Sequence, residues 1–136
     1  FEITEGLLME DSEFAQARIR EFQDAGFLFS LDDFGTGYSS LSYLKKFPLD
    51  VLKIDKSFIE EVDVDPQAAA LVKTTIELAK TFNMECVAEG VETLSQAETL
   101  QLFGCYNHQG FFYSRPLPAD QITTLIEQHW PDVSSV

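Results

Sequence analysis

Cysteine is scarce in this 136-residue sequence, where only Cys86 and Cys105 occur and no C-x-x-C motif is present. The sequence therefore predicts no disulfide framework, which fits a protein of the reducing cytoplasm. No apolar run reaches the length of about 18 residues that marks a membrane span, and the amino terminus lacks the charged and apolar regions of a signal peptide. The first residue is Phe1 rather than methionine, so we expect a piece of a longer protein, which can carry a membrane anchor elsewhere.

Positive charge is scarce as well, because 9 lysine and arginine residues face 23 acidic ones and the net charge is −14. Binding to a nucleic-acid polymer needs clustered lysine and arginine, so this partner class is excluded as the main one. An acidic protein can still bind a small phosphate ligand when divalent cations supply the positive charge. The hydrophobic content of 45%, with twelve phenylalanines, is typical of one folded domain with a core.

Short apolar segments alternate with amphipathic ones along the chain. The predicted strands are residues 1–3, 27–31, 51–54, 86–88 and 109–113. The clearest helix starts are Asp65-Pro66, an N-cap with a first-turn proline, and the capping box of Thr93 and Gln96. This alternation predicts an α/β fold with parallel strands and right-handed crossovers. The sheet is either small and open or part of a (β/α)₈ barrel, which needs roughly 250 residues.

Each predicted strand carries a chemically useful polar residue at or near one end: Glu2, the pair Asp32 and Asp33, Lys53, Glu89 and Gln109. One acid in such a place is usually a helix cap or an exposed turn. A set on five successive strands is harder to explain in that way, because the carboxyl ends of parallel strands line the binding sites of α/β folds. We therefore expect these side chains to share one site.

The chemistry of this set suits hard divalent cations. Several carboxylate oxygens match Mg²⁺ or Mn²⁺ better than a metal that prefers thiolate or imidazole. Asp32 and Asp33 can both turn toward one centre at a frayed strand end, which suits a two-metal site with a bridging carboxylate. Lys53 would balance charge and orient an anion or a water. In-line attack of a metal-activated water on a phosphodiester is the reaction that fits this combination.

Five motifs occur in an order and approximate spacing that resemble the EAL-domain phosphodiesterases: FEITE (1–5), DDFGTG (32–37), KID (53–55), AEGVET (88–93) and QGF (109–111). Enzymes of that family hydrolyse the bacterial second messenger cyclic di-GMP to linear pGpG. The resemblance covers residues 1–130, which leaves 131–136 as a tail. It implies the carboxyl-terminal portion of a (β/α)₈ TIM-like barrel, with about five β/α units.

The resemblance also implies roles for individual residues. It makes Glu2, Asp32, Asp33 and Glu89 ligands of a two-metal Mg²⁺ or Mn²⁺ site, with Asp32 as the bridge. Lys53 would hold the attacking water or a phosphate oxygen, and Glu89 would be the catalytic carboxylate at the second metal.

Further residues are implied to support this site. Gln109 would hydrogen-bond within it. Glu5 would anchor the loop that contains Phe34, Gly35, Thr36 and Gly37, and Glu92 would act as a supporting partner. The resemblance connects this loop with substrate binding and with coupling between the subunits of a dimer.

Two features of the family are absent from the sequence, namely the Glu-Ala-Leu motif and the asparagine that joins the metal set. Both belong to barrel strands that would precede Phe1. We therefore expect this chain alone to be inactive and to self-associate through unpaired strand edges. We also expect regulatory domains elsewhere in the parent protein and no membrane contact by this segment.

Three functions compete at this point. The first is an active cyclic di-GMP phosphodiesterase, and the second is a non-catalytic receptor of the same fold that binds the dinucleotide or a protein. The third is an open α/β domain similar to a phosphoryl receiver. A receiver places its acidic pair after the first strand and its phosphoacceptor on a later strand, whereas Lys53 follows Asp32 and Asp33 here by a single β/α step.

Overall fold

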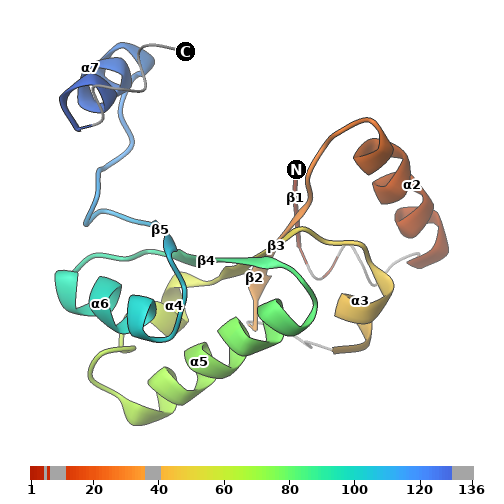
Figure 1. The fold of residues 1–136 in the computed structure, drawn as a ribbon, viewed down its shortest axis with the longest axis horizontal. Coiled ribbons are helices and arrows are strands. Elements are labelled where there is room, and N and C mark those ends of the chain that lie inside the picture. Colours follow the sequence, from red (N-terminus) through yellow and green to blue (C-terminus); the bar gives the residue numbers. More distant parts are fainter. Residues whose placement is uncertain (5, 7–11, 36–40, 130–136) are drawn as a thin grey trace.

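The computed structural model of the chain describes residues 1–4, 6, 12–35 and 41–129 (Figure 1). Its strands are β1 (Glu2–Thr4), β2 (Ser30–Phe34), β3 (Val51–Ile54), β4 (Glu85–Glu89) and β5 (Asn107–Gln109). Its helices are α2 (Ser12–Asp24), α3 (Leu41–Lys46), α4 (Lys56–Ile59), α5 (Pro66–Thr81), α6 (Leu94–Leu102) and α7 (Ala119–His129). None of the described helices is both long and apolar enough to cross a membrane.

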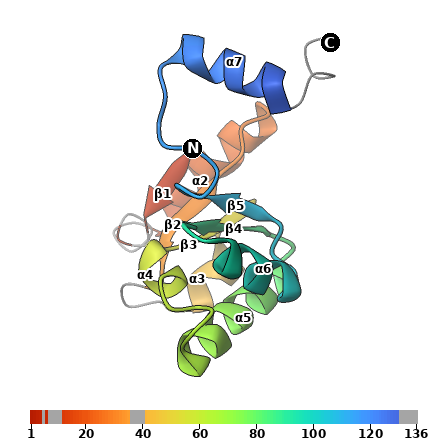
Figure 2. The same cartoon turned by 90° about the vertical axis from the view of Figure 1, so that its left-hand side faces the viewer.

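The five strands form one parallel sheet whose spatial order, β1-β2-β3-β4-β5, is the order of the sequence. Open doubly wound folds, including receivers, reverse their strand order at a switch point. A strictly sequential order is instead the arrangement of a barrel wall, so it argues against the receiver-like alternative. Helices α3 to α6 cover one face of the sheet, while α2 and α7 lie toward its two ends (Figures 1 and 2).

The hydrophobic core lies between the sheet and the helices that cover it. Strands β3 and β4 contribute the fully buried Leu52, Ile54 and Ala88, and α5 packs Val72 and Ile76 against them. Lys53 is the only charged side chain among the described residues that is also buried, with 7% of its surface exposed. A buried charge is costly unless it is paired, so the position of Lys53 indicates where charged partners, and a candidate functional site, are to be found.

The two helix starts predicted from sequence are confirmed. Asp65 caps α5 by accepting hydrogen bonds from the backbone N–H groups of Gln67 and Ala68, each at 3.1 Å. Thr93 and Gln96 form the predicted capping box at the start of α6. Caps of this kind satisfy N–H groups that have no partner within the helix, so α5 and α6 start at defined residues.

The second strand was predicted three residues too early. Gly26 follows α2 with a backbone conformation in the left-handed region (φ 91°), and the N–H of Phe27 donates a hydrogen bond to the carbonyl of Phe22 at 3.0 Å. This Schellman arrangement makes Phe27 part of the helix cap, so the strand starts only at Ser30. Asp32 therefore lies within β2 rather than after it.

The fifth strand was predicted two residues too late. It covers Asn107–Gln109, and the aromatic residues 111–113 form a turn rather than strand core. The apolar run favoured a strand in the sequence, but Phe111, Phe112 and Tyr113 are 40–51% exposed. As a consequence, Gln109 ends β5 instead of opening it, as Glu89 ends β4.

Candidate active site

Four of the predicted site residues meet at one point on the sheet. The Nζ atom of Lys53 on β3 lies 2.7 Å from Glu2 Oε1, 3.1 Å from Asp32 Oδ1 and 2.7 Å from Glu89 Oε1. These partners come from β1, β2 and β4, so one ammonium connects four adjacent strands. Parallel pairing in sequential order is what brings residues so distant in sequence to one point. We call Glu2, Asp32, Lys53 and Glu89 the lysine–carboxylate cluster.

The cluster stabilises the charged form of Lys53. Burial acts to lower the pKa of this amine, but the contacts with Glu2, Glu89 and Asp32 outweigh burial and raise the pKa well above its usual value. Lys53 is therefore an ammonium throughout the physiological pH range. The site therefore holds a permanent positive charge in contact with three carboxylates.

A β-bulge shapes the acidic pair. The pairing of β2 with β3 shifts register between Leu31 and Phe34, and Asp33 within this interval has a positive φ of 55°. Bulges re-aim side chains and are frequent next to active sites, and aspartate tolerates the left-handed region better than most residues. The bulge breaks the strict alternation that would send Asp32 and Asp33 to opposite faces.

The donor set fits a hard divalent cation by its chemistry. The Oδ1 atom of Asp32 is buried and accepts no hydrogen bond in the described part of the chain, although Lys53 is close enough for an ion pair. A buried oxygen in this state can accept a further partner. The side chains are not arranged as a metal site, because among the described residues no group of three acidic, histidine or cysteine side chains is placed to hold an ion. The ammonium of Lys53 lies at the point where three carboxylates converge.

A cavity of about 230 Å³ lies beside the cluster, and its lining includes Glu89. The end of β5 contributes Gln109, Gly110 and Phe111 to its wall. The register of the sheet pairs Glu89 with Gln109, so the two last strands present a carboxylate and an amide side by side. Ligand pockets usually have volumes of about 300–1,000 Å³, so this cavity can hold only part of a dinucleotide.

Lys56 is a residue of this cavity that sequence reasoning missed. Its Nζ atom lies 2.6 Å from Glu92 Oε1, and its side-chain stem packs against Gly90, which has a positive φ of 69°. The contact with Glu92 raises the pKa of Lys56 and lowers that of Glu92. Its position directly after the KID motif was the signal in the sequence that could have identified Lys56 as a residue of the site. The predicted supporting role of Glu92 thus has a concrete partner.

Gly110 holds the end of β5 against the turn after β4. A Cβ atom at this position would overlap the backbone of Val91. The backbone N–H of Val91 donates to the backbone carbonyl of Gln109 at 3.1 Å, and the backbone N–H of Phe112 donates to the carbonyl of Val91 at 3.0 Å. Close backbone approach of this kind requires glycine.

We expect Gly110→Ala to lower the free energy of unfolding by about 2 kcal/mol, because overpacking and loss of these hydrogen bonds both act against the fold. Urea denaturation of the 136-residue chain measures the change. The control is Gly6→Ala, since a Cβ at Gly6 meets no described atom within 4 Å. Equal stability of the two variants would contradict this description of the β5 end.

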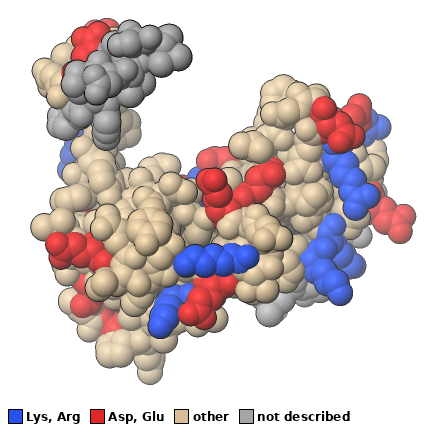
Figure 3. Space-filling view, viewed as in Figure 1, with Lys and Arg blue, Asp and Glu red and all other residues tan. Residues whose placement is uncertain are grey.

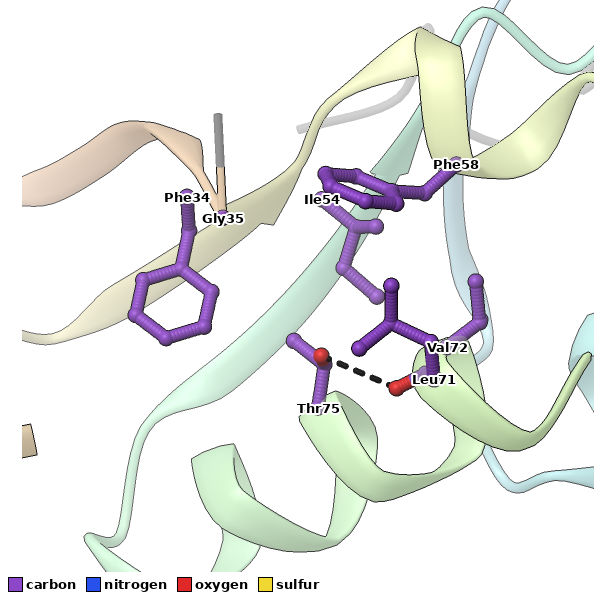
Figure 4. Close-up of a pocket in the computed structure, with 7 residues that line it drawn as sticks. All are labelled: Phe34, Gly35, Ile54, Phe58, Leu71, Val72 and Thr75. Atoms are coloured by element: carbon purple, nitrogen blue, oxygen red, sulfur yellow. Dashed lines mark hydrogen bonds between the residues drawn. The ribbon is translucent and has the colours of Figure 1, made fainter. Parts of the chain in front are cut away.

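The predicted loop residues are only partly described. Phe34 is buried, and Gly35 has a positive φ of 97° and lies close to the ring of Phe58. The predictions for Glu5, Thr36 and Gly37 concern residues outside the described part of the chain. Phe34 and Gly35 also border a second cavity of about 290 Å³, which side chains from β3, α4 and α5 complete (Figure 4). This cavity has no charged lining residue, so it does not suit a phosphodiester.

Acidic side chains gather on the surface above the middle of the sheet, in the hollow between α7 and α2 (Figure 3). Such a surface repels an anionic ligand unless cations compensate. The charge distribution therefore disfavours a phosphate on its own, in line with a donor set whose chemistry suits a cation.

Comparison with known proteins gives consistent results. The family model for the EAL domain matches residues 1–116. The chain is 46% identical over 121 residues to MucR of Pseudomonas aeruginosa, named a bifunctional diguanylate cyclase/cyclic di-GMP phosphodiesterase, and the match covers 89% of this chain and 18% of MucR. The chain thus spans less than a fifth of the length of this relative.

Solved structures support the same relationship. The EAL domain of Mycobacterium smegmatis DcpA superimposes with a TM-score of 0.88 at 42% identity, covering 93% of this chain and 57% of that one. A manganese/cyclic di-GMP complex of Klebsiella pneumoniae BlrP1 superimposes with a TM-score of 0.78 at 33% identity, covering 85% and 29% of the two chains. The sequential parallel sheet and these superpositions confirm the predicted partial TIM-like barrel. The chain belongs to the EAL domain family.

Proposed function

We propose that the longer protein containing this chain hydrolyses cyclic di-GMP to linear pGpG in a reaction that depends on divalent metal ions. The observation that carries the proposal is the convergence of Glu2, Asp32 and Glu89, from three strands of a parallel sheet, on the ammonium of Lys53. The naming of MucR as a cyclic di-GMP phosphodiesterase, and of the BlrP1 structure as a manganese/cyclic di-GMP complex, supports the choice of substrate and cofactor class.

The proposed cofactor is Mg²⁺ or Mn²⁺, held by Glu2, Asp32, Asp33 and Glu89. When bound there, such ions supply Lewis-acid stabilisation of the phosphate and lower the pKa of water. Barrel strands other than the five described here would complete the ligand set.

The residues of this chain have separate tasks in the proposal. Glu89 accepts the proton of the attacking water as its oxygen approaches phosphorus. Lys53 donates a hydrogen bond to that water or to a non-bridging phosphate oxygen, and its charge stabilises the transition state. Gln109 and the wall of the 230 Å³ cavity hold the neighbouring part of the dinucleotide in position.

One observation favours a second candidate, a receptor that binds cyclic di-GMP or a partner protein without cleaving it. The three carboxylates of the cluster already form ion pairs with Lys53, and an ammonium in this place can take the position of a metal as a counter-charge. Asp33 and Gln109 would then contribute to binding only.

Incubation of the longer protein with cyclic di-GMP and Mn²⁺ or Mg²⁺ distinguishes the two candidates. The proposal predicts that pGpG accumulates, that a chelator stops its formation and that added metal restores it. Binding of cyclic di-GMP without any pGpG at saturating metal would establish the receptor and contradict the proposed hydrolysis.

The 136-residue chain by itself is proposed to be inactive, because it lacks the Glu-Ala-Leu motif and the asparagine expected in the metal set. Regulatory domains elsewhere in the longer protein and a cytoplasmic location are part of the same proposal. Addition of cyclic di-GMP and Mn²⁺ to the isolated chain is expected to yield no pGpG, whereas turnover at the rate of the longer protein would contradict this.

The isolated chain is also expected to self-associate. Within the described residues β1 pairs only with β2 and β5 pairs only with β4, so each has an unpaired edge. Unpaired edges are templates for pairing with another chain. Light scattering coupled to size exclusion is expected to show a mass that rises with concentration, and a monomer at all concentrations would contradict the prediction.

A further inference from the structure

Two buried thiols, outside the lysine–carboxylate cluster, lie together where β4 and β5 begin. Cys86 is on β4 and Cys105 lies two residues before β5, and both are free. The Sγ atom of Cys105 is 3.4 Å from the carbonyl oxygen of Cys86. The proposed hydrolysis uses neither residue.

The backbone positions of the two cysteines suit a disulfide bond. The register pairs Val87 with Asn107, so Cys86 and Cys105 are one step out of alignment on neighbouring segments. A strand spacing of about 4.8 Å and a rise of about 3.3 Å would place the Cα atoms of such a pair about 6 Å apart. Because Cys105 precedes β5 in irregular backbone, its side chain does not follow the alternation of a strand. Disulfides usually have Cα separations of about 4.4–6.8 Å.

The end of α6 holds Cys105 in this place. Gly104 has a positive φ of 84°, and the N–H of Cys105 donates to the carbonyl of Leu100 at 3.0 Å. This Schellman arrangement determines the direction in which the chain leaves the helix. The thiol therefore faces Cys86 because of a rigid helix cap and not because of a loose loop.

The two thiols differ in acidity. The pKa of Cys105 is lowered by a hydrogen bond from the Cys86 thiol, with support from nearby backbone N–H groups and from Lys80, although burial acts in the opposite direction. The same contact raises the pKa of Cys86. The ammonium of Lys80 lies next to Gly104, beside Cys105. A thiol next to a cation and hydrogen-bond donors forms the thiolate more readily and is the more reactive member of a pair.

We propose that Cys105 and Cys86 form an oxidation site that hydroperoxides convert to an intramolecular disulfide. The Cys105 thiolate attacks one oxygen of hydrogen peroxide and breaks the O–O bond, which gives a sulfenic acid and, after uptake of a proton, water. The Cys86 thiol then attacks the sulfenic sulfur, and its proton leaves with the hydroxide as a second water. The two thiols lose two electrons to one peroxide.

In the 136-residue chain by itself, the position of β5 at the edge of the described sheet gives a small oxidant access to these buried atoms. β5 has three residues and, in the described part of the chain, pairs only with β4. Short edge elements open locally at low free-energy cost. A disulfide here would tie the starts of β4 and β5 together, and the far ends of these strands carry Glu89 and Gln109.

The test exposes the folded 136-residue chain to hydrogen peroxide and measures its intact mass and its free thiols after denaturation. The proposal predicts loss of two hydrogens in mass, loss of both thiols, a peptide pair linked through Cys86 and Cys105, and full reversal by dithiothreitol. In Cys86→Ala, Cys105 is expected to stop at a sulfenic acid that dimedone traps. In Cys105→Ala, Cys86 is expected to remain reduced.

Lys80→Met tests the environment of Cys105 and is expected to slow the oxidation. Lys73→Met on the same helix is the matched control and is expected to leave the rate of oxidation unchanged. Thiols that stay reduced in the folded wild-type chain, under conditions that oxidise glutathione, would overturn the proposal. Oxidation only in urea, or disulfides only between chains, would overturn it as well. These measurements need no hydrolytic activity and are independent of the proposed function.

Discussion

Replacement of Lys53 by methionine is expected to lower the free energy of unfolding by about 3–5 kcal/mol, because removal of one partner from a buried ion pair leaves uncompensated charge. Methionine has a similar length, so the packing of the stem is largely kept. The loss comes from Asp32 and Glu89, which are 77–82% buried and would face each other without the ammonium. Glu2 contributes less, because its side chain is 61% exposed and can turn into solvent.

Urea denaturation of the 136-residue chain measures this loss as a lower midpoint with an unchanged slope. Lys73→Met is the matched control, since Lys73 is an exposed lysine on α5 and surface substitutions usually stay within about 0.5 kcal/mol. Glu89→Gln in the Lys53→Met background should recover part of the stability, because the two side chains are in contact. Equal midpoints for the two lysine variants would contradict the role of Lys53 as the counter-charge.

The pH dependence of this stabilisation follows from the direction of the pKa shift. The folded state raises the pKa of Lys53 above its value in the unfolded chain. The contribution is therefore complete below the ordinary lysine pKa of about 10.4, and it is lost only as the pH rises above that value. Lys53 should stabilise the fold equally at pH 6 and pH 8.

Sequence reasoning was most successful where local chemistry determines the structure. The start of α5 at Asp65-Pro66 and the capping box of Thr93 and Gln96 depend on residues at most three positions apart, and both are present. β3 was predicted at its observed bounds because it is apolar apart from Lys53. The convergence of Asp32, Lys53 and Glu89 followed from the rule that parallel strands present their carboxyl ends at one edge, whereas Glu2 opens β1 and reaches the same point with its side chain.

Sequence reasoning was less successful where contacts between residues distant in sequence determine the structure. The aromatic residue Phe27 looked like the start of a strand, but the cap of α2 uses its N–H group. The bulge at Asp33 depends on the register with β3, which local sequence does not contain. Lys56 and Gly110 gained their importance only from packing against Gly90 and Val91.

Replacement of Glu89 by glutamine in the longer protein is expected to lower kcat for hydrolysis of cyclic di-GMP by about 10²–10⁴-fold, the usual contribution of a general acid–base group. Glutamine keeps the size of the side chain but cannot accept the proton of the attacking water, and it is a poorer ligand for a hard cation. Because the contact of Glu89 Oε1 with Lys53 at 2.7 Å is also weakened, the ammonium would be less well placed toward the phosphate.

The most direct test of the lysine–carboxylate cluster as a hydrolytic site is the rate of pGpG formation by three forms of the longer protein: wild type, Glu89→Gln and Glu85→Gln. Glu85 and Glu89 lie at opposite ends of the same strand, so Glu85→Gln makes the same chemical change away from the cluster. We predict that Glu85→Gln retains the wild-type rate and that Glu89→Gln loses at least about 99% of it. Similar rates for all three proteins would contradict the assignment of the site.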